Sequence, residues 1–210
     1  MLKDSKNVTD KSKRLQYFYK NGGTSISPFF IILTFPDNKE YNYSMAIVYL
    51  SLGSNLGDRV GYLQQAASLI GAIEDIKIVA TSSFYETEPW NMPTDNWFVN
   101  AIVQISTSLT PIELLSECHR IERQLGRVRF DENKYEDRTI DIDILFYDDL
   151  VINNETLVIP HKHFHKRAFL LVPMLEIAQD FIHPIYKKTV SELYEELENP
   201  EMVYLYGTRV

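Results

Sequence analysis

Hydrophobic and polar positions change their spacing repeatedly after residue 44, and this spacing predicts strands and helices in alternation. A strand-like apolar run at 46–52 is followed by a helical spacing of apolar side chains at Leu56, Val60, Leu63, Ala67 and Ile70. Further strands are expected near 76–87 and at 97–107, separated by the turn-rich sequence EPWNMPTDN. The first half of this region therefore has the order β-α-β-β.

The next helix has the clearest boundaries in the chain. Thr110 is the expected N-cap, Pro111 occupies the first helical position, and Glu113 completes a capping box. Gly126 is expected to end the helix, because glycine readily adopts the left-handed conformation that follows a helix C-terminus.

The last part of the chain continues the alternation. A strand is expected at 139–147, followed by strand-like LVIN and LVIPH and a helix near 166–178. The tail KKTVSELYEELEN repeats the capping-box pattern with Thr189 and Glu192, which predicts a final helix. The β-α-β-β-α-β order predicts a ferredoxin-like α+β fold, with a mainly antiparallel sheet and helices packed on its faces.

Residues 1–44 have a different character. They are polar and basic, with seven Lys/Arg against four Asp/Glu, and they show no sustained periodicity. Two interpretations remain open: a genuine, poorly ordered N-terminal extension, or upstream sequence translated ahead of a true start at Met45. The second is favoured, because Met45 immediately precedes the first core strand. The functional domain is therefore expected to be 45–210.

Composition narrows the class of protein. A single cysteine, Cys118, excludes an intrachain disulfide and gives no sign of an oxidising compartment. The early apolar run Pro28–Phe35 is too short to span a bilayer and too late to be a signal peptide. The net charge of −8 argues against nonspecific binding to nucleic acid. We expect a cytoplasmic protein with no membrane and no nucleic-acid partner.

The sequence DRTIDIDIL places two carboxylates on one face of a strand. Asp141 and Asp143 alternate with isoleucines, so their Cα atoms lie roughly 6.6–6.8 Å apart on the same side. Such carboxylates repel each other unless cations neutralise them, and Mg²⁺ takes one or two carboxylates together with substrate phosphates and water. For this motif alone, a solvent-facing strand kept soluble by its acids is the commoner explanation.

Basic residues near these acids favour phosphate chemistry. The segment between Gly126 and the acidic strand carries Arg127, Arg129, Lys134 and Arg138, which could hold a polyphosphate beside a metal ion. The run IPHKHFHKR supplies His161, His163 and His165, but no cysteine or clear fourth ligand accompanies them. One catalytic or phosphate-binding histidine is favoured over a metal centre.

The sequence LGSNLGDR lacks the Gly/Lys spacing of a Walker A motif, so a plain strand-to-helix turn and a substrate-lining role both remain open. It is also one of six stretches that resemble the 6-hydroxymethyl-7,8-dihydropterin pyrophosphokinase family in order and approximate spacing. The resemblance covers about residues 46–184, and the other five stretches are SSFYETEP, FVNAIVQISTSLTPIELL, IERQLGRVR, DRTIDIDIL and IPHKHFHKRAFLLVPMLEIAQDFIHP.

The resemblance implies an ATP-dependent diphosphotransferase of folate biosynthesis, which transfers pyrophosphate from ATP to the hydroxymethyl group of the pterin and leaves AMP. Asp141 and Asp143 match the acids that bind two Mg²⁺ ions, and Arg127 and Arg138 match catalytic, phosphate-contacting arginines. The resemblance further implies that ATP is bound by Glu122, Arg127, Arg129, Arg138, His161 and Arg167.

On the pterin side, the resemblance implies that Asn100 hydrogen-bonds the ring and that Phe98 and Phe169 sandwich it. The chain around Thr87, Glu88 and Trp90 would contact the ring edge. A flat heterocycle suits two aromatic faces and one amide that both donates and accepts. The implied product would pass to dihydropteroate synthase.

The chain departs from the family pattern before Arg138. Many members have Gly-Pro at this point, where this chain has Glu136 and Asp137, and nothing in the sequence explains Asp137. No compelling general base is present, with Asp143 the nearest candidate. A second hypothesis is a non-catalytic ferredoxin-like module that senses ATP·Mg. Such a module would need the acids and the arginines, but not a pterin sandwich.

Overall fold

The computed structural model describes residues 45–89, 93–128 and 136–208. The predictions for residues 1–44, whether a genuine extension or upstream sequence, lie outside the described residues. So do the two predicted site residues Trp90 and Arg129.

The sheet is built around two long strands, β1 (Ala46–Ser54) and β4 (Phe98–Thr107), which pair antiparallel along their length. The other edge of β1 pairs with β5 (Asp141–Tyr147). The other edge of β4 pairs first with β2 (Ile76–Thr81) and then with β3 (Tyr85–Thr87). All these pairings are antiparallel, as the sequence predicts, and β5 is an edge strand of the sheet.

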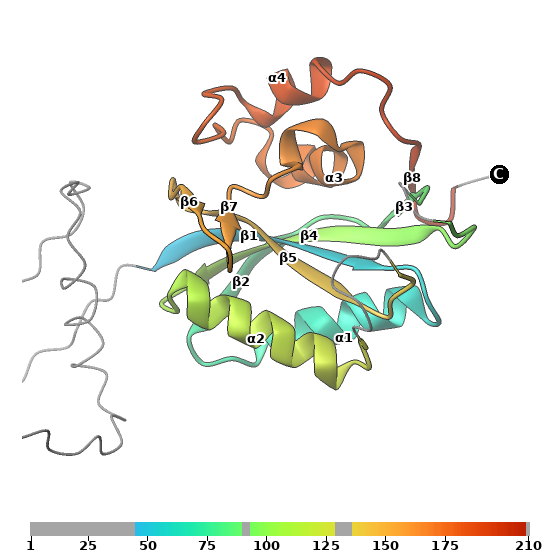
Figure 1. Cartoon of the computed structure of the whole chain (residues 1–210), viewed down its shortest axis with the longest axis horizontal. Coiled ribbons are helices and arrows are strands. Elements are labelled where there is room, and N and C mark those ends of the chain that lie inside the picture. The colour runs from blue at the N-terminus through green and yellow to red at the C-terminus, as the bar shows by residue number, and fades with distance from the viewer. Residues whose placement is uncertain (1–44, 90–92, 129–135, 209–210) are drawn as a thin grey trace, which may run out of the picture. The chain divides into compact units, whose positions relative to one another are not determined.

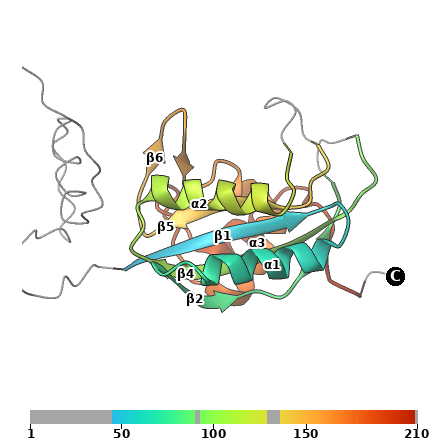
Figure 2. The same cartoon turned by 90° about the horizontal axis from the view of Figure 1, so that it is seen from below.

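Helices cover both faces of the sheet (Figure 1). On one face lie α1 (Arg59–Gly71) and α2 (Pro111–Gln124), which run side by side roughly along the direction of β1 (Figure 2). On the other face lie α3 (Ala168–Ala178) and α4 (Val190–Glu195). The result is the ferredoxin-like α+β architecture that the order of elements predicts.

Smaller elements connect β5 to α3. The short strands β6 (Ile152–Asn153) and β7 (Val158–Ile159) form where the sequence predicts strands, and they pair with each other. A 3-10 turn, η2 (Phe164–Lys166), leads into α3. Among the described residues, no helix is both long and apolar enough to cross a membrane.

Local sequence explains where the helices begin and end. Both predicted capping boxes form, with Thr110 and Glu113 at the start of α2 and Thr189 and Glu192 at the start of α4. Gly126 follows α2 with φ +82°, a left-handed conformation that favours glycine. This turn directs the chain from the end of α2 towards β5.

Two apolar clusters hold the layers together. The cluster under α1 and α2 includes Ile142 and Ile144 of β5, which confirms that the isoleucines of the acidic strand point into the core. The cluster under α3 and α4 includes Ile102 of β4 and Phe146 of β5. Because Asp141 and Asp143 alternate with the isoleucines, their side chains leave the sheet on the α3 side.

Two local predictions are wrong, and one strand was not predicted. The expected strand at 76–87 is two strands, because Ser82 turns the chain while still bonding Ile102 of β4 through both its N–H (2.8 Å) and its hydroxyl (2.9 Å). The first helix begins at Arg59 rather than at Leu56, because the Asp58 carboxylate caps it. The strand β8 (Val203–Leu205), which pairs with β3, was not expected.

Candidate active site

One row of residues crosses the middle of the sheet and joins the predicted pterin and metal residues. Gly53 of β1 lies opposite Asn100 of β4 on one side and opposite Asp141 of β5 on the other. Residues that lie opposite each other in antiparallel strands share a face, and neighbouring strands are about 4.8 Å apart. The amide and the carboxylate therefore leave one face from backbone positions about 10 Å apart.

Gly53 leaves space between these two side chains. A Cβ atom added to it would lie 2.7 Å from Asn100 Oδ1 and 3.9 Å from Phe98 Cδ1. The Asn100 side chain is buried, and its Nδ2 donates to Thr87 Oγ1 at 2.7 Å. Glycine is thus required where the predicted pterin residues approach the backbone of β1.

The carboxylate of Asp141 is held by two cations. Arg127 donates to one of its oxygens, and Arg138 Nε lies 2.9 Å from the other. Asp143, one pleat further along β5, has a raised pKa, because it is desolvated and because the Asp141 carboxylate repels its charge. Two of the predicted phosphate-binding arginines are therefore in direct contact with Asp141, one of the two predicted metal ligands.

Glu122 links the far face of the sheet to this site. It lies in α2, is 2% exposed, and accepts a hydrogen bond from the backbone N–H of Ile142 at 2.9 Å. The same Oε1 atom also accepts from Arg127, which follows α2 after the turn at Gly126. Since β5 is an edge strand, Arg127 reaches around it to Asp141 on the opposite face.

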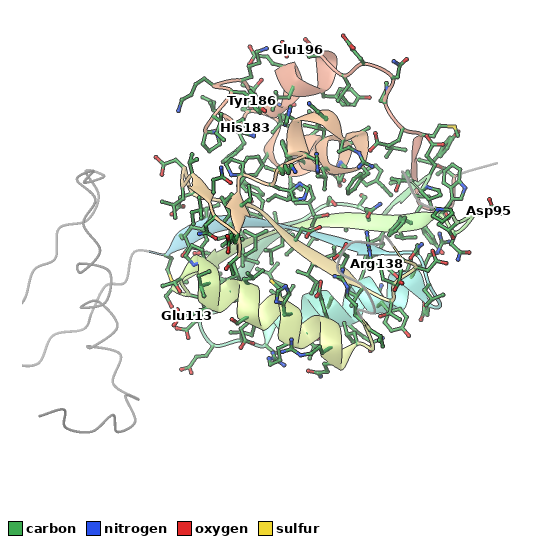
Figure 3. All side chains as sticks on the ribbon, in the orientation of Figure 1. Asp95, Glu113, Arg138, His183, Tyr186 and Glu196 are labelled. Atoms are coloured by element: carbon green, nitrogen blue, oxygen red, sulfur yellow. The ribbon has the colours of Figure 1, made fainter. Side chains whose placement is uncertain are left out.

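Arg138 connects the metal side to the pterin side. Besides its contact with Asp141, its guanidinium carbon lies 5.2 Å from the centre of the Phe98 ring. Arg138 lies at the same end of the sheet as Asp95, while Glu113, at the start of α2, lies at the opposite end (Figure 3). The site therefore forms where α2 ends.

The layer above the sheet supplies the remaining predicted residues. Arg167 stacks over the ring of Phe169, with its guanidinium carbon 4.7 Å from the ring centre. Glu201 fixes both residues, since its Oε1 atom accepts from Arg167 Nε at 3.1 Å and from the Phe169 N–H at 3.2 Å. Each of the two predicted sandwich aromatics is therefore in contact with an arginine.

His161 carries a buried polar atom whose hydrogen-bonding capacity is unused. Its Nδ1 atom has no hydrogen-bond partner among the described residues. Burial, with a contribution from His163, lowers the pKa of His161 to about 4, so the imidazole is neutral at pH 7. Since the Asp141 charge acts on it, a ligand held beside Asp141 is within its electrostatic reach.

The three histidines of the H-x-H-x-H run do not converge on one point. The rings of His161 and His163 lie 6.1 Å apart at 71°, and His165 contacts Tyr186 instead, at 3.0 Å between Nε2 and the hydroxyl. Among residues 45–89, 93–128 and 136–208, no group of three or more His, Cys, Asp or Glu could hold a metal ion.

The donor set at Asp141 and Asp143 nevertheless fits Mg²⁺. Both are hard oxygen ligands on one face, and a neighbouring cation would oppose the burial and the Asp141 charge that raise the pKa of Asp143. Two carboxylates alone do not complete an octahedron, so phosphate oxygens and water must supply the other positions. The pair suits a metal that arrives with a polyphosphate.

The turn LGSNLGDR contributes more than sequence reasoning assigned to it. Gly53 lies between the two halves of the site, and Asn55 is 4% exposed with its amide bonded to residues before β5. The turn also leads into α1, which confirms the strand-to-helix interpretation, while the substrate-lining role stays a prediction. Glu88 lies after β3, where its Oε1 accepts from the Met202 N–H at 3.0 Å.

Known structures share this fold. A structure described as HPPK-DHPS in complex with substrates matches with a TM-score of 0.61 and 15% identity, covering 72% of this chain and 43% of that chain. A wild-type HPPK-DHPS of Plasmodium falciparum matches with a TM-score of 0.60 and 17% identity, covering 74% and 44%. This chain thus spans less than half the length of these solved chains.

Curated relatives are much closer in sequence. The 2-amino-4-hydroxy-6-hydroxymethyldihydropteridine pyrophosphokinase of Methylorubrum extorquens is 44% identical over 154 residues, covering 73% of this chain and 95% of the relative. The enzyme of the same name from Haemophilus influenzae is 39% identical over 161 residues, covering 77% and 99%. A family model described as 7,8-dihydro-6-hydroxymethylpterin-pyrophosphokinase (HPPK) matches residues 49–179. This chain therefore belongs to the 7,8-dihydro-6-hydroxymethylpterin-pyrophosphokinase family.

Proposed function

We propose that this chain transfers the terminal diphosphoryl group of ATP to the hydroxymethyl group of 6-hydroxymethyl-7,8-dihydropterin, in folate biosynthesis. The products are AMP and the pterin diphosphate. Membership of the family and the names of relatives at 39% and 44% identity support this activity. It is the ATP-dependent pyrophosphokinase reaction that the sequence motifs predict.

The observation that carries the proposal is the row Asn100, Gly53 and Asp141 across three neighbouring strands. It supports a pterin bound at Asn100 whose hydroxymethyl group extends over Gly53 towards phosphates held beside Asp141. The spacing of about 10 Å between the two outer backbone positions suits a bicyclic ring and a one-carbon arm. Gly53 has no side chain to block that path.

The reaction requires little covalent help from the protein. The alcohol oxygen attacks the β-phosphorus of ATP, the bond from that phosphorus to the oxygen bridging to the α-phosphorus breaks, and AMP leaves with that oxygen. The hydroxyl proton is released. Because an alcohol is a poor nucleophile, catalysis depends on in-line positioning and on neutralising the charge that develops on the phosphates.

Each residue near Asp141 has a proposed part in that charge balance. Arg127 and Arg138 bind phosphate oxygens, and Glu122 orients Arg127 by accepting its hydrogen bond. The neutral imidazole of His161 and the guanidinium of Arg167 contact the phosphates from the α3 side. We propose that Arg129, which lies outside the described residues, binds the same phosphates.

Asp141 and Asp143 would hold two Mg²⁺ ions that arrive with ATP. When bound, the metal neutralises phosphate charge and aligns the attacking and leaving oxygens. On the pterin side, Asn100 hydrogen-bonds the ring and Phe98 and Phe169 cover its faces. The chain at Thr87, Glu88 and Trp90 borders the ring edge.

The second hypothesis, a module that only senses ATP·Mg, is not favoured. A module that only binds ATP·Mg would not require the buried Asn100 amide bonded to Thr87. It would also not require Gly53, whose missing side chain leaves space between Asn100 and Asp141. The family to which the chain belongs is also described as a pyrophosphokinase and not as a regulatory module.

We also propose that the product passes to a dihydropteroate synthase. Solved relatives described as HPPK-DHPS carry both names on one chain, which supports consecutive reactions. A cytoplasmic location is proposed because the single cysteine, Cys118, is a free and buried thiol, as is usual in a reducing compartment.

Incubation with ATP, Mg²⁺ and 6-hydroxymethyl-7,8-dihydropterin, followed by ion-exchange separation of nucleotides, tests the activity. AMP and the pterin diphosphate should appear in equal amounts. The matched control is 6-methyl-7,8-dihydropterin, which lacks the attacking hydroxyl and should give no AMP. Accumulation of ADP, or AMP formation independent of the pterin, would refute the proposal.

A further inference from the structure

Asp137 joins three separate segments of the chain beside the candidate active site. Its Oδ1 accepts from Asn55 Nδ2 at 2.6 Å, and its Oδ2 accepts from Thr94 Oγ1 at 3.2 Å and from Asn96 Nδ2. Asn55 lies between β1 and α1, the other two donors lie just before β4, and Asp137 lies before β5. We call Asp137 and these three donors the Asp137 cluster.

The geometry of Asn55 shows that the cluster is specific. Asn55 Oδ1 accepts from the backbone N–H of Arg138 at 2.7 Å, which fixes the amide so that its Nδ2 faces Asp137. The backbone N–H of Asn55 also donates to the Arg138 carbonyl at 3.1 Å. Asn55 thus makes three hydrogen bonds to Asp137 and Arg138.

A carboxylate is the side chain that this position requires. An ionised aspartate only accepts hydrogen bonds, and its two oxygens offer about four acceptor positions, which suits three converging donors. Hydrogen bonds to an ionised acceptor are also stronger than those between neutral groups. An asparagine would turn an N–H group towards at least one of the three donors.

The cluster adjoins both halves of the site. Arg138, the next residue, contacts Asp141 at 2.9 Å and lies 5.2 Å from the Phe98 ring centre. Asn96 is two residues before Phe98, and Asn55 is two residues after Gly53. Each segment bonded to Asp137 therefore leads directly to a residue of the row or to the arginine above it.

We propose that Asp137 is a positioning residue, which holds Arg138 in register with the pterin-side segment that ends in Phe98 and Asn100. This inference rests on the proposed function of the site. Without the Asp137 carboxylate, each substrate can still bind, but the phosphates at Arg138 and the acceptor at Asn100 lose their fixed alignment. The loss falls on turnover, because in-line transfer depends on that alignment.

The test compares Asp137→Asn with Glu136→Gln in the full-length chain. Both variants remove one negative charge from adjacent residues, but only the first disturbs the cluster. We expect kcat for AMP formation to fall about tenfold in Asp137→Asn, with the dissociation constants of pterin and of a nonhydrolysable ATP analogue changed less than about threefold. Glu136→Gln should keep the wild-type kcat.

Asn96→Ala provides a second route to the same answer, because its side chain is exposed and its loss does not threaten folding. It should lower kcat severalfold in the wild-type background and have a much smaller effect in Asp137→Asn, because the two residues act through one contact. A purely structural role would instead lower the melting temperature and leave the kinetics of the folded protein unchanged.

The proposal is overturned if kcat of Asp137→Asn lies within twofold of that of Glu136→Gln. It is equally overturned if Asn96→Ala has no effect on kcat or has its full effect in both backgrounds. These outcomes are distinct from failure of the proposed function, in which the wild-type chain itself forms no pterin-dependent AMP.

Discussion

Glu122 and Ile142 are joined across the edge of the sheet, where one carboxylate oxygen accepts the Ile142 N–H at 2.9 Å and also pairs with Arg127. A buried carboxylate of α2 thus fixes both the acidic strand and an arginine of the site. A residue on the far face of the sheet therefore helps to position Arg127 in the candidate active site.

We expect Glu122→Gln to separate the hydrogen bond to β5 from the ion pair with Arg127. The amide oxygen can still accept the Ile142 N–H, but the charge that holds Arg127 is gone, so kcat/KM for ATP should fall about tenfold or more. Urea unfolding should show a smaller loss of stability than in Glu122→Ala, which leaves the buried Ile142 N–H unpaired, removes one of the two carboxylate partners of Arg127, and should cost about 3 kcal/mol. Equal activity of Glu122→Gln and wild type would contradict this role.

Gly53→Ala should weaken pterin binding while leaving the fold intact. Its Cβ atom would lie 2.7 Å from Asn100 Oδ1, so the amide must move away from its ring-binding position. We expect the dissociation constant for pterin to rise about tenfold by calorimetry with an ATP analogue present. Gly71→Ala, at the remote end of α1, is the matched control and should bind pterin normally. Unchanged affinity in Gly53→Ala would exclude a tight approach of pterin here.

Asp141→Ala and Asp143→Ala should lower turnover far more than pterin affinity, since we propose that the acids act on metal and phosphate. EDTA should stop AMP formation by the wild type, and added Mg²⁺ should restore it. The measurements are the AMP rate and pterin calorimetry for each variant. A variant whose only defect is pterin binding would show that the carboxylate belongs to the other half of the site.

Periodicity predicted the fold well where an element buries one side. It found α2 because buried residues recur every three to four positions, and it found β5 because core and partly exposed positions alternate over residues 141–144. It missed the break between β2 and β3, because the bonds from Ser82 to Ile102 are tertiary and leave no mark on local spacing. It missed β8 because that strand is short and largely exposed.

The residues of the candidate site could be predicted only in part from the sequence. The acid pair and the arginines could be recognised from their residue types and spacing, which suit metal and phosphate binding. Asn100 and the two phenylalanines became candidates only through the family resemblance. Asp137 had no explanation in the sequence, because its donors lie between 41 and 82 residues away and only the folded chain brings them together. Gly53 could have been found by asking why a glycine occupies a core strand.

Phe169→Ala should weaken pterin binding by roughly tenfold, because it removes one aromatic face and the partner on which Arg167 stacks at 4.7 Å. Phe169→Tyr keeps the ring and should stay within a few-fold of wild type. Calorimetry with an ATP analogue distinguishes the two. Equal affinity in both variants would mean that the ring does not cover the pterin.

His183 should make the stability of the fold sensitive to acid. It is 2% exposed in the layer formed by α3 and α4, and its Nδ1 atom accepts from the N–H groups of Ile185 (3.1 Å) and Tyr186 (3.3 Å), which requires an unprotonated Nδ1. Burial, with a contribution from the charge of His165, lowers the pKa of His183 to about 4.

The sign follows from proton binding. In the unfolded chain, His183 binds a proton below its ordinary pKa of about 6.5, whereas in the folded chain it stays neutral down to about pH 4. Stability is therefore lost as the pH falls from about 6.5 to about 4. The loss contributed by His183 is on the order of 3 kcal/mol when complete. His183→Asn keeps an acceptor for the two N–H groups but does not titrate. Urea unfolding at pH 7 and pH 5 should therefore show a smaller drop in the variant than in the wild type, whatever their absolute stabilities. Equal drops in the two proteins would show that His183 does not remain neutral in the folded state.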